Sequence, residues 1–495
     1  VNYRLYPSAE RMGLMRNRQV HAYAEEQRRE THRIFNDHYR DLGLIPHQDL
    51  LPFIRQALPA PNLPVLEEGL AVYFTPRWQR EGFRYWAGRL AAGQADLSLQ
   101  ELMEVGTDQT RSPLIREAMA GALVDFLQES WGKKTFLSRY ASWQPSPADY
   151  QELGPQWQGY LQELATAQPV KAWKGESLDY YAGMTLAHEG YRIYNGYGSD
   201  SAKHALSKLS SLHVNSIALV PYTGTRNRSK PTPFRVSQGA GGENDAAVIA
   251  SFVHAKDLEM QVLMKPQIWF PGSWPGDVEM SNEADWQAWF QYYRAWIAHY
   301  AMLSAIHQVD VLCAGVEFAK ATLSHPREWS DLIRGLRQIY PGPITYAANW
   351  GNEAEKLAFG HELDFIGVNC YYPLSDQAEA SKAELAAGFA KVRRKLAAIH
   401  QQHQVPIVLT EVGFRCVEAA WRNPHAGPEG RSFDEQAQKL GYEVVFEGLA
   451  DADWCHGMFW WKWPSYLGYA QRNLTSFTPC HRPAMGVIEQ WYGRR

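Results

Sequence analysis

From about residue 180 onward, short apolar runs alternate with longer amphipathic segments in a regular order. Strands are expected at 180–186, 214–220, 260–266, 310–316, 343–348, 363–369, 406–411 and 456–461. Helices are expected at 199–211, 243–257, 283–305, 326–340, 352–359, 377–402, 433–449 and 484–492. Eight strand–helix pairs over about 315 residues are typical of a closed parallel barrel. The alternation therefore predicts an α/β fold, a (β/α)8 TIM barrel over 179–495.

The alternative arrangement is an open, doubly wound sheet. That fold usually carries a glycine-rich phosphate turn after its first strand, with the pattern GxGxxG or GxxxxGK[ST]. Neither pattern follows the first expected strand, and the glycines at 239–242 lie on a later loop without the lysine. The barrel is therefore preferred.

Two of the expected strands end on a glutamate. The run Val311–Val316 leads to Glu317, and the run Pro406–Thr410 leads to Glu411. A carboxylate inside an apolar core costs several kcal/mol unless it is paired or protonated, whereas the carboxyl ends of barrel strands face the active-site loops. The two glutamates are 94 residues apart, about three βα units of roughly 30 residues. Two carboxylates facing each other across a pocket are the minimum for glycoside hydrolysis.

Other strand ends carry aromatic, amide and basic side chains. Sugar rings stack on aromatic faces, and amides or lysines bind their hydroxyls, so we expect substrate contacts from Lys265, Trp269, Asn349, Trp350, Asn369, Tyr371, Tyr372, Arg415 and Trp461. Trp461 is the expected sugar platform, although strand alternation only shows that it and Trp460 face opposite sides. Hydrogen-bonded packing is the alternative for the tyrosines and asparagines. A surface position is the alternative for Lys265, Lys462 and His188.

On these motifs, residues 173–492 resemble glycoside hydrolase family 113, within clan A of the (β/α)8 retaining glycosidases. The resemblance rests on Gly315-Val316-Glu317, on the run Thr410–Arg415, on the run Asp364–Pro373 and on the tryptophan-rich stretch 459–463. It implies Glu317 as the general acid and base and Glu411 as the nucleophile, with carboxyl groups about 5–5.5 Å apart. Tyr371, Tyr372 or Arg415 would donate to the nucleophile. No metal or organic cofactor is implied.

One position departs from the clan pattern. Many members carry asparagine immediately before the acid/base glutamate, and this chain has Val316. A hydrogen bond to the sugar 2-hydroxyl that strengthens in the transition state would then come from elsewhere. Asn349 and Asn369 are the candidates.

The resemblance implies hydrolysis of β-1,4-linked mannan or manno-oligosaccharides. Mannose and glucose differ in the orientation of one hydroxyl, and nothing in the sequence reveals which orientation is bound. A hydrolase of β-glucan or another β-glycan is therefore the nearest alternative, and endo and exo action stay open. A non-catalytic glycan-binding protein is the alternative from another class, because of Val316.

Residues 1–145 read as a separate, mostly α-helical domain. Helices are expected at 20–40, 47–58, 65–75, 97–105, 112–129 and 132–140. Residues 146–178 read as a linker, because proline and glutamine are frequent there, with one connecting helix at 149–166.

Parts of this segment resemble the helical half of gluzincin-type metallopeptidases. The run His47–Leu51 matches a HExxH helix, and Glu67–Phe74 matches the helix that supplies the third zinc ligand. His47 and Glu68 match ligands, but Gln48 replaces the general base and Leu51 the second histidine. A catalytic zinc needs about three protein ligands, so the resemblance implies a degenerate, metal-free domain. An unrelated helical domain is the alternative.

The composition limits the partners. The net charge is −4 and no basic block is present, so we expect a polysaccharide or oligosaccharide as partner and no nucleic acid. No apolar run reaches 18 residues, so no membrane span is expected. The five cysteines form no CxxC motif and are expected as buried reduced thiols. A polysaccharide-degrading enzyme would favour a secreted, periplasmic or surface location, and the start at Val1 fits a trimmed or mature chain.

Overall fold

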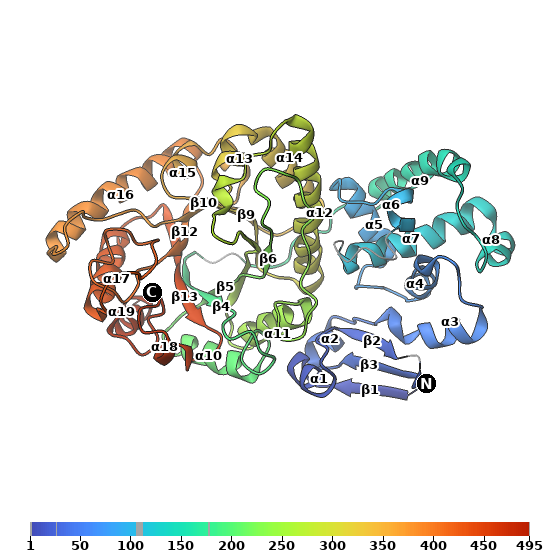
Figure 1. Ribbon diagram of the computed structural model, residues 1–495, viewed down its shortest axis with the longest axis horizontal. Helices are drawn as coiled ribbons and strands as arrows, with labels where there is room; N and C mark the ends of the chain where they lie inside the picture. Colours follow the sequence, from blue (N-terminus) through green and yellow to red (C-terminus); the bar gives the residue numbers. More distant parts are fainter. Residues whose placement is uncertain (1, 26, 105–111, 177–178, 495) are drawn as a thin grey trace.

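The computed structural model describes residues 2–25, 27–104, 112–176 and 179–494. The N-terminal part contains β1 (Asn2–Tyr6), α1 (Ala9–Arg16), β2 (Ala22–Glu25), β3 (Glu30–Ile34), α2 (Asp37–Asp41), η1 (His47–Asp49), α3 (Leu51–Ala57), α4 (Pro64–Tyr73), α5 (Phe83–Ala92), α6 (Leu99–Glu104), α7 (Pro113–Trp131), α8 (Lys133–Arg139) and α9 (Pro147–Ala167). Figure 1 shows this part beside the larger barrel.

The larger part alternates strands and helices. It contains β4 (Tyr181–Ala187), α10 (Asp200–Ser210), β5 (Ser216–Leu219), β6 (Tyr222–Gly224), α11 (Asp245–Lys256), β7 (Gln261–Met264), β8 (Gln267–Trp269), η3 (Pro275–Asp277), α12 (Glu283–His307), β9 (Val311–Val316), α13 (Ala319–Ser324), α14 (Pro326–Arg337), β10 (Ile344–Asn349), α15 (Asn352–Lys356), η4 (Gly360–Glu362), β11 (Phe365–Asn369), α16 (Lys382–His403), β12 (Ile407–Val412), α17 (Glu435–Leu449), β13 (Cys455–Pro464), α18 (Tyr469–Arg472) and α19 (Pro483–Tyr492).

Eight of these strands form a closed barrel in the order β10-β11-β12-β13-β4-β5-β7-β9. All neighbours are parallel, and β13 closes the ring by pairing with β4. The predicted (β/α)8 barrel is confirmed, and each of the eight expected strands lies where a barrel strand is found. Alternate side chains fill the barrel interior in a cluster that includes Val311, Cys313 and Phe459, as expected for a packed barrel core. A short pair, β6 with β8, lies outside the ring.

The N-terminal part is mostly helical, as predicted, but one stretch was interpreted wrongly. The expected helix at 20–40 consists instead of β2, β3 and the short α2, and β3 pairs with β1 on one side and β2 on the other. The strands form because β3 is covered from both sides, with Thr31 and His32 buried. Helices α1 and α5 were not predicted, and the last residue of the expected helix at 97–105 lies outside the described residues.

Helix α9 covers the expected connecting helix at 149–166. It begins with a capping box, in which Ser146 and Asp149 bind each other's backbone amides. Its buried face includes Trp157 and Leu161 and packs against α5. Packing therefore joins this helix to the helical bundle.

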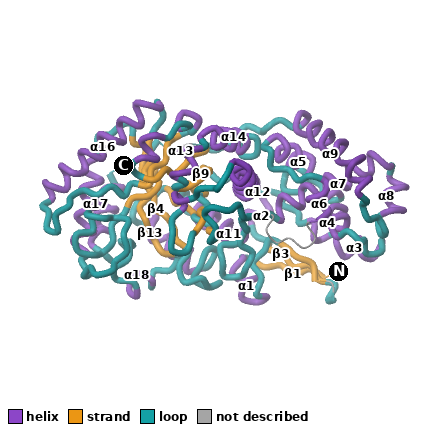
Figure 2. The backbone as a smooth tube through the Cα atoms, turned by 45° about the horizontal axis from the view of Figure 1, so that its top comes forward, coloured by secondary structure: helices purple, strands orange, loops and turns teal. Residues whose placement is uncertain are grey.

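The N-terminal part contacts the side of the barrel through α1 against α11 and α7 against α12, and Figure 2 shows the same neighbours from another side. Polar contacts connect the two parts. Ser112 Oγ lies 2.8 Å from His299 Nδ1, His38 Nε2 lies 2.9 Å from His307 Nδ1, and Arg80 donates to the Ile306 carbonyl. Buried polar contacts thus accompany the apolar packing between the two parts.

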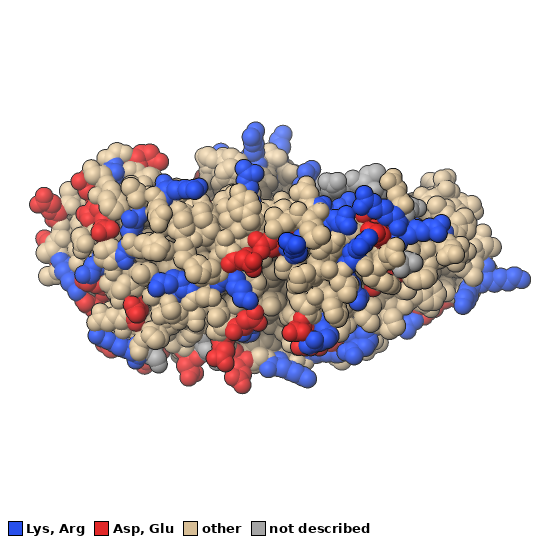
Figure 3. All heavy atoms as spheres, turned by 90° about the horizontal axis from the view of Figure 1, so that it is seen from below, with Lys and Arg blue, Asp and Glu red and all other residues tan. Residues whose placement is uncertain are grey.

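Among the residues that the structure describes, no helix combines the length and the apolar character needed to cross a bilayer. On the face drawn in Figure 3, lysine and arginine side chains are intermixed with aspartate and glutamate.

Candidate active site

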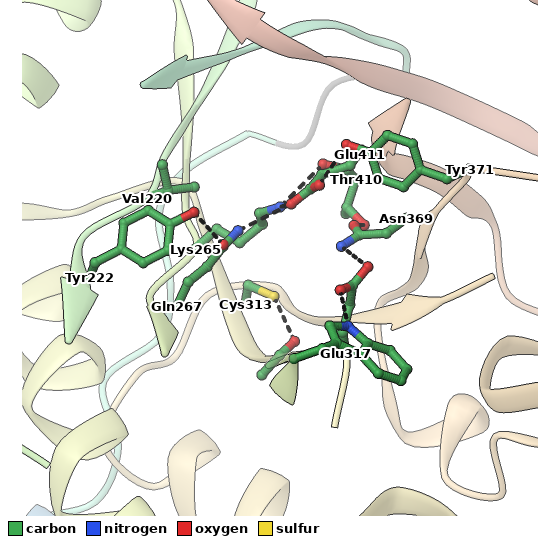
Figure 4. A network of polar contacts seen from close by, with 12 residues as sticks. Val220, Tyr222, Lys265, Gln267, Cys313, Glu317, Asn369, Tyr371, Thr410 and Glu411 are labelled. Carbon is green, nitrogen blue, oxygen red and sulfur yellow. Dashed lines mark hydrogen bonds and ion pairs between the residues drawn. The ribbon is translucent and has the colours of Figure 1, made fainter. Parts of the chain in front are cut away.

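Glu317 and Glu411 lie at the carboxyl ends of the fourth and seventh barrel strands. Glu317 directly follows β9, and Glu411 is the fifth residue of β12. Their side chains point toward the same region at the mouth of the barrel (Figure 4). Glu317 has a left-handed backbone, with φ 58°, which costs about 1–3 kcal/mol for a residue other than glycine. The turn is held by hydrogen bonds from the Glu317 amide to Ala347 O and from the Phe318 amide to Tyr346 Oη.

Glu411 is buried and receives hydrogen bonds from three side chains. Lys265 Nζ and Gln267 Nε2 both donate to Oε1, the latter over 3.1 Å. Tyr371 Oη donates to Oε2 over 2.8 Å. Lys265 is itself fully buried. These donors bind both oxygens of the Glu411 carboxyl group and fix its orientation.

Glu317 has a different environment. Trp274 Nε1 donates to its Oε2 over 2.7 Å, and Asn369 Nδ2 donates to its Oε1 over 3.0 Å. The pKa of Glu317 is raised to about 7, chiefly by burial and secondly by the negative charge of Glu411. A carboxyl group with such a pKa can hold a proton near neutral pH and release it, which is the requirement for a general acid.

Asn369 connects the two glutamates. It lies opposite Glu411 in the register of β11 and β12, and its Oδ1 accepts a hydrogen bond from Thr410 Oγ1 over 3.0 Å. That contact fixes the amide so that its nitrogen faces Glu317. Figure 4 shows Tyr222 next to Gln267, the side chains of Gln267 and Lys265 directed at Glu411, and Asn369 between Thr410 and Glu317.

A pocket of about 580 Å³ opens at the carboxyl ends of the first, second and eighth barrel strands, and its lining includes neither Glu317 nor Glu411. One lining residue, Tyr222, donates to Gln267, which in turn donates to Glu411. The pocket lining includes His188, Glu189, Tyr191, Tyr222, Glu243, Trp269, Trp461 and Lys462. Trp269 is 60% exposed, and Lys265 Nζ lies 5.7 Å from the centre of the Trp461 ring. Lys462 and Glu189 form an ion pair. Flat aromatic faces next to charged hydrogen-bonding groups are what a sugar ring requires.

The structure also decides between the two tryptophans of the eighth strand. Trp460 is fully buried and stacks on Tyr442, with ring centres 3.7 Å apart. Trp461 faces the pocket. The expected platform residue is therefore the one available to a ligand.

Two predicted donors to Glu411 do not contact it. Arg415 instead donates to the carbonyls of Ala426 and Thr475 and lies over the Phe477 ring. Tyr372 Oη accepts from the Gly351 amide and donates to Glu355. Of the two tyrosines it is Tyr371 that donates to Glu411. The prediction that Arg415 donates to Glu411 is wrong, because its guanidinium group binds the two loop carbonyls instead.

Asn349 and Trp350 lie at the end of β10. Asn349 Nδ2 donates to the Trp350 carbonyl over 3.1 Å, and the Asn349 amide donates to Glu353. Asn349 is thus bound to its own loop, and Asn369 is the asparagine that contacts Glu317. The half-buried Trp350 ring packs against Tyr372 and His425.

Several functional candidates were missed or misjudged. Lys265 and His188 are buried, so the surface alternative is wrong for both. Gln267 and Trp274, which contact Glu411 and Glu317, were not proposed as site residues. Gln267 follows Lys265 by two positions, and this spacing was the only available signal for it. Nothing local marks Trp274, which reaches Glu317 from a loop.

The region that resembles a metallopeptidase contains His47, Glu68 and Glu117 with possible ligand atoms within 4.8 Å of one another. Glu68 forms a double hydrogen bond with Arg116, over 2.9 and 2.8 Å. His47 Nδ1 accepts from Trp78 Nε1. The guanidinium group thus neutralises the carboxylate that the resemblance would assign to a metal.

Comparisons with known proteins agree with this geometry. The family model of Glycoside Hydrolase Family 113 matches residues 184–476. One similar structure, described as a complex of a GH113 β-1,4-mannanase, is 21% identical with a TM-score of 0.55 and covers 64% of this chain and 99% of that one. Another, the GH113 β-mannanase AaManA from Alicyclobacillus acidocaldarius in complex with ManMIm, is 23% identical with a TM-score of 0.56, covering 64% and 98%. At these identities the likeness establishes the fold. The search of curated proteins gave no match.

Proposed function

This chain belongs to glycoside hydrolase family 113, and we propose that its barrel hydrolyses β-1,4-linked mannan or manno-oligosaccharides with retention of configuration. The similar structures are described as β-1,4-mannanases and β-mannanases, which supports mannan as the substrate class. The pocket that Trp461 lines is connected to Glu411 through Tyr222 and Gln267, which supports binding of a sugar chain there.

In the proposed mechanism, Glu411 attacks the anomeric carbon and Glu317 gives its proton to the departing glycosidic oxygen. A covalent glycosyl-enzyme results. Glu317, now ionised, takes a proton from water, the water oxygen bonds to the anomeric carbon, and the bond to Glu411 breaks. Two inversions at the same carbon give net retention. The sequence of steps uses only the two carboxyl groups and one water molecule.

The observation that carries the proposal is the contrast between the two carboxyl groups. Glu411 is held by Lys265, Gln267 and Tyr371, whereas burial raises the pKa of Glu317 to about 7. Glu411 is fixed in place by three donors, whereas Glu317 can carry a proton near neutral pH. Retaining glycosidases need this division of roles.

Incubation with mannohexaose, cellohexaose and xylohexaose tests the proposal. We expect shorter products from mannohexaose, and their first-formed anomer, followed by NMR, should be β. Cleavage of cellohexaose with mannohexaose left intact would instead identify a β-glucanase. An α-anomer as first product would exclude the retaining mechanism. Binding of mannohexaose without products would identify a glycan-binding protein.

A further inference from the structure

The N-terminal part reaches the loops that line the sugar pocket. Gln19, just after α1, is 1% exposed. Its Oε1 accepts a hydrogen bond from the Gly241 amide over 2.7 Å and a second from Asn244 Nδ2 over 3.3 Å. Its Nε2 is buried and has no hydrogen-bond partner among the described residues. Both hydrogen bonds of the Gln19 side chain are therefore made by its oxygen.

Gly241 contacts both Gln19 and the pocket residue His188. Its φ is +78°, and an added Cβ would lie 3.2 Å from the Ile193 amide nitrogen and 3.4 Å from Arg192. Its carbonyl oxygen lies 3.2 Å from His188 Nε2. The Tyr197 amide donates to His188 Nδ1, so Nε2 carries the ring proton and donates to Gly241. Burial lowers the pKa of His188 to about 4, which keeps the ring neutral. His188 is part of the pocket lining.

The same loop is tied to the proposed nucleophile. Glu243, in the pocket lining, accepts a hydrogen bond from the Tyr222 amide over 2.6 Å. Tyr222 Oη donates to Gln267 Oε1 over 2.6 Å, and Gln267 Nε2 donates to Glu411. A chain of contacts thus runs from the loop at 239–244 to Glu411.

Helix α1 also supports the neighbouring loop at 188–199. Gly13 lies so close to Ile193 that an added Cβ would be 2.9 Å from its Cγ2. Glu10 Oε2 accepts a hydrogen bond from the Asp200 amide over 3.1 Å. Both loops on this side of the pocket therefore have their outer surfaces against the N-terminal part.

We propose that Gln19 is a positioning residue through which the N-terminal part holds the pocket wall in its substrate-binding arrangement. The inference rests on the proposed function, because it concerns the same pocket. The pocket wall, here the loops that carry His188 and Glu243, would bind substrate and does not contain the two proposed catalytic glutamates. The loss of the Gln19 contact should therefore weaken substrate binding more than it slows bond cleavage.

Two substitutions of similar size at Gln19 test the proposal. Gln19→Met removes the acceptor oxygen, whereas Gln19→Glu keeps an acceptor at the same place. We expect Gln19→Met to raise KM for mannohexaose about tenfold with kcat changed less than twofold. Gln19→Glu should restore KM to within about threefold of the wild type. The matched control is Arg80→Ala, which removes another contact between the two parts, at the end of α12, and should leave KM unchanged.

Hydrogen exchange of residues 239–244 gives a readout without activity. Gln19→Met should exchange these amides at least about tenfold faster than the wild type, and Gln19→Glu and Arg80→Ala should not. Unchanged KM with faster exchange would overturn the inference, as would equal KM changes in all three variants. If the wild type cleaves none of the three hexaoses, the proposed function fails. Separately, unchanged exchange in Gln19→Met would show that the hydrogen bond between Gln19 and Gly241 does not hold the loop. Melting temperatures within about 3 °C of the wild type verify folding.

Discussion

Lys265 Nζ and Glu411 Oε1 form an ion pair in which the lysine side chain is fully buried. An ion pair removed from water breaks even only when its geometry is good and its other atoms are also hydrogen-bonded. Gln267 and Tyr371 supply those additional contacts on Glu411. Removal of one partner leaves the other buried without its ion-pair partner, which is costly.

Lys265→Met should lower kcat by about 10²–10³-fold, because it removes the cationic donor to the proposed nucleophile. Steady-state kinetics on mannohexaose measures the effect. Gln267→Met is the matched control, since it removes a neutral donor to the same oxygen and should cost about tenfold. A larger loss from Gln267→Met than from Lys265→Met would contradict the importance of the charge.

The roles of the two glutamates can be separated by azide. Glu411→Ala should be inactive with mannohexaose, and azide should occupy the space of the missing carboxylate and give an α-glycosyl azide from an activated β-mannoside. Glu317→Ala should still form the glycosyl-enzyme from an activated substrate, so azide then gives a β-glycosyl azide. NMR of the products distinguishes them. The opposite pattern would exchange the two assignments.

The pKa of Glu317 predicts a dependence of both activity and stability on pH. Burial raises this pKa from 4.5 to about 7 in the folded protein, so the fold favours the protonated form. The associated stabilisation is complete below about pH 4.5 and is lost as the pH rises through about 7. The value of kcat/KM should fall above about pH 7, because the general acid then loses its proton.

Glu317→Gln keeps the shape of the protonated acid and removes the titration. At pH 8 this variant should melt about 1–3 °C above the wild type, and near pH 4 the two should melt together. Differential scanning calorimetry at several pH values measures the difference. A stability gain that does not change with pH would show that the carboxyl group of Glu317 is not the cause.

The left-handed turn at Glu317 depends on Tyr346. Its hydroxyl accepts from the Phe318 amide over 2.8 Å and donates to Glu353 over 2.7 Å. Tyr346→Phe should cost about 1–3 kcal/mol of stability, since buried polar groups lose their partner. It should also lower kcat about tenfold, because small displacements of a catalytic group are costly.

Tyr293→Phe is the control for that variant. Tyr293 donates to the Ala314 carbonyl from a buried position. Its ring packs against Phe318, a contact that phenylalanine keeps, and its hydroxyl group does not bind the Glu317 turn. We expect a comparable loss of stability in chemical denaturation, with kcat unchanged. Equal effects of both variants on kcat would mean that the Tyr346 hydroxyl has no special part in placing Glu317.

Two glycines of the N-terminal part should respond to alanine in opposite ways. An added Cβ at Gly69 in α4 would lie 2.3 Å from the Ala120 carbonyl oxygen in α7, whereas one at Gly154 in α9 meets nothing within 4 Å. Gly69→Ala should destabilise the helical bundle by about 1–3 kcal/mol. Gly154→Ala should stabilise it by about 0.5–1 kcal/mol. Urea denaturation measures both, and stabilisation by Gly69→Ala would contradict the close helix contact.

The barrel was predictable because its strands are short apolar runs between helices, and that signal is local. Val311–Val316 and Ile407–Val412 are buried along their whole length. The strands β2 and β3 carry no comparable signal. Glu30–Ile34 is a polar sequence, and it becomes a strand by pairing with β1, whose residues lie 28 positions earlier. Pairing between distant segments is not visible in local composition.

The active site was predictable only for residues that end a barrel strand. Glu317, Glu411 and Lys265 are marked by their places at strand ends. Trp274 was missed because it approaches Glu317 from a loop, and the path of that loop is set by tertiary packing. Arg415 was assigned wrongly, because the sequence motif gives its position in the chain and not the direction of its side chain.

All five cysteines are buried, and all lie between residues 313 and 480. The N-terminal part has none. Thiol-labelling reagents therefore report on opening of the barrel alone, and the rate at which each thiol is modified measures how often its surroundings expose it. The wild-type chain thus carries its own set of chemical probes, with which unfolding of the barrel can be followed separately from that of the helical bundle.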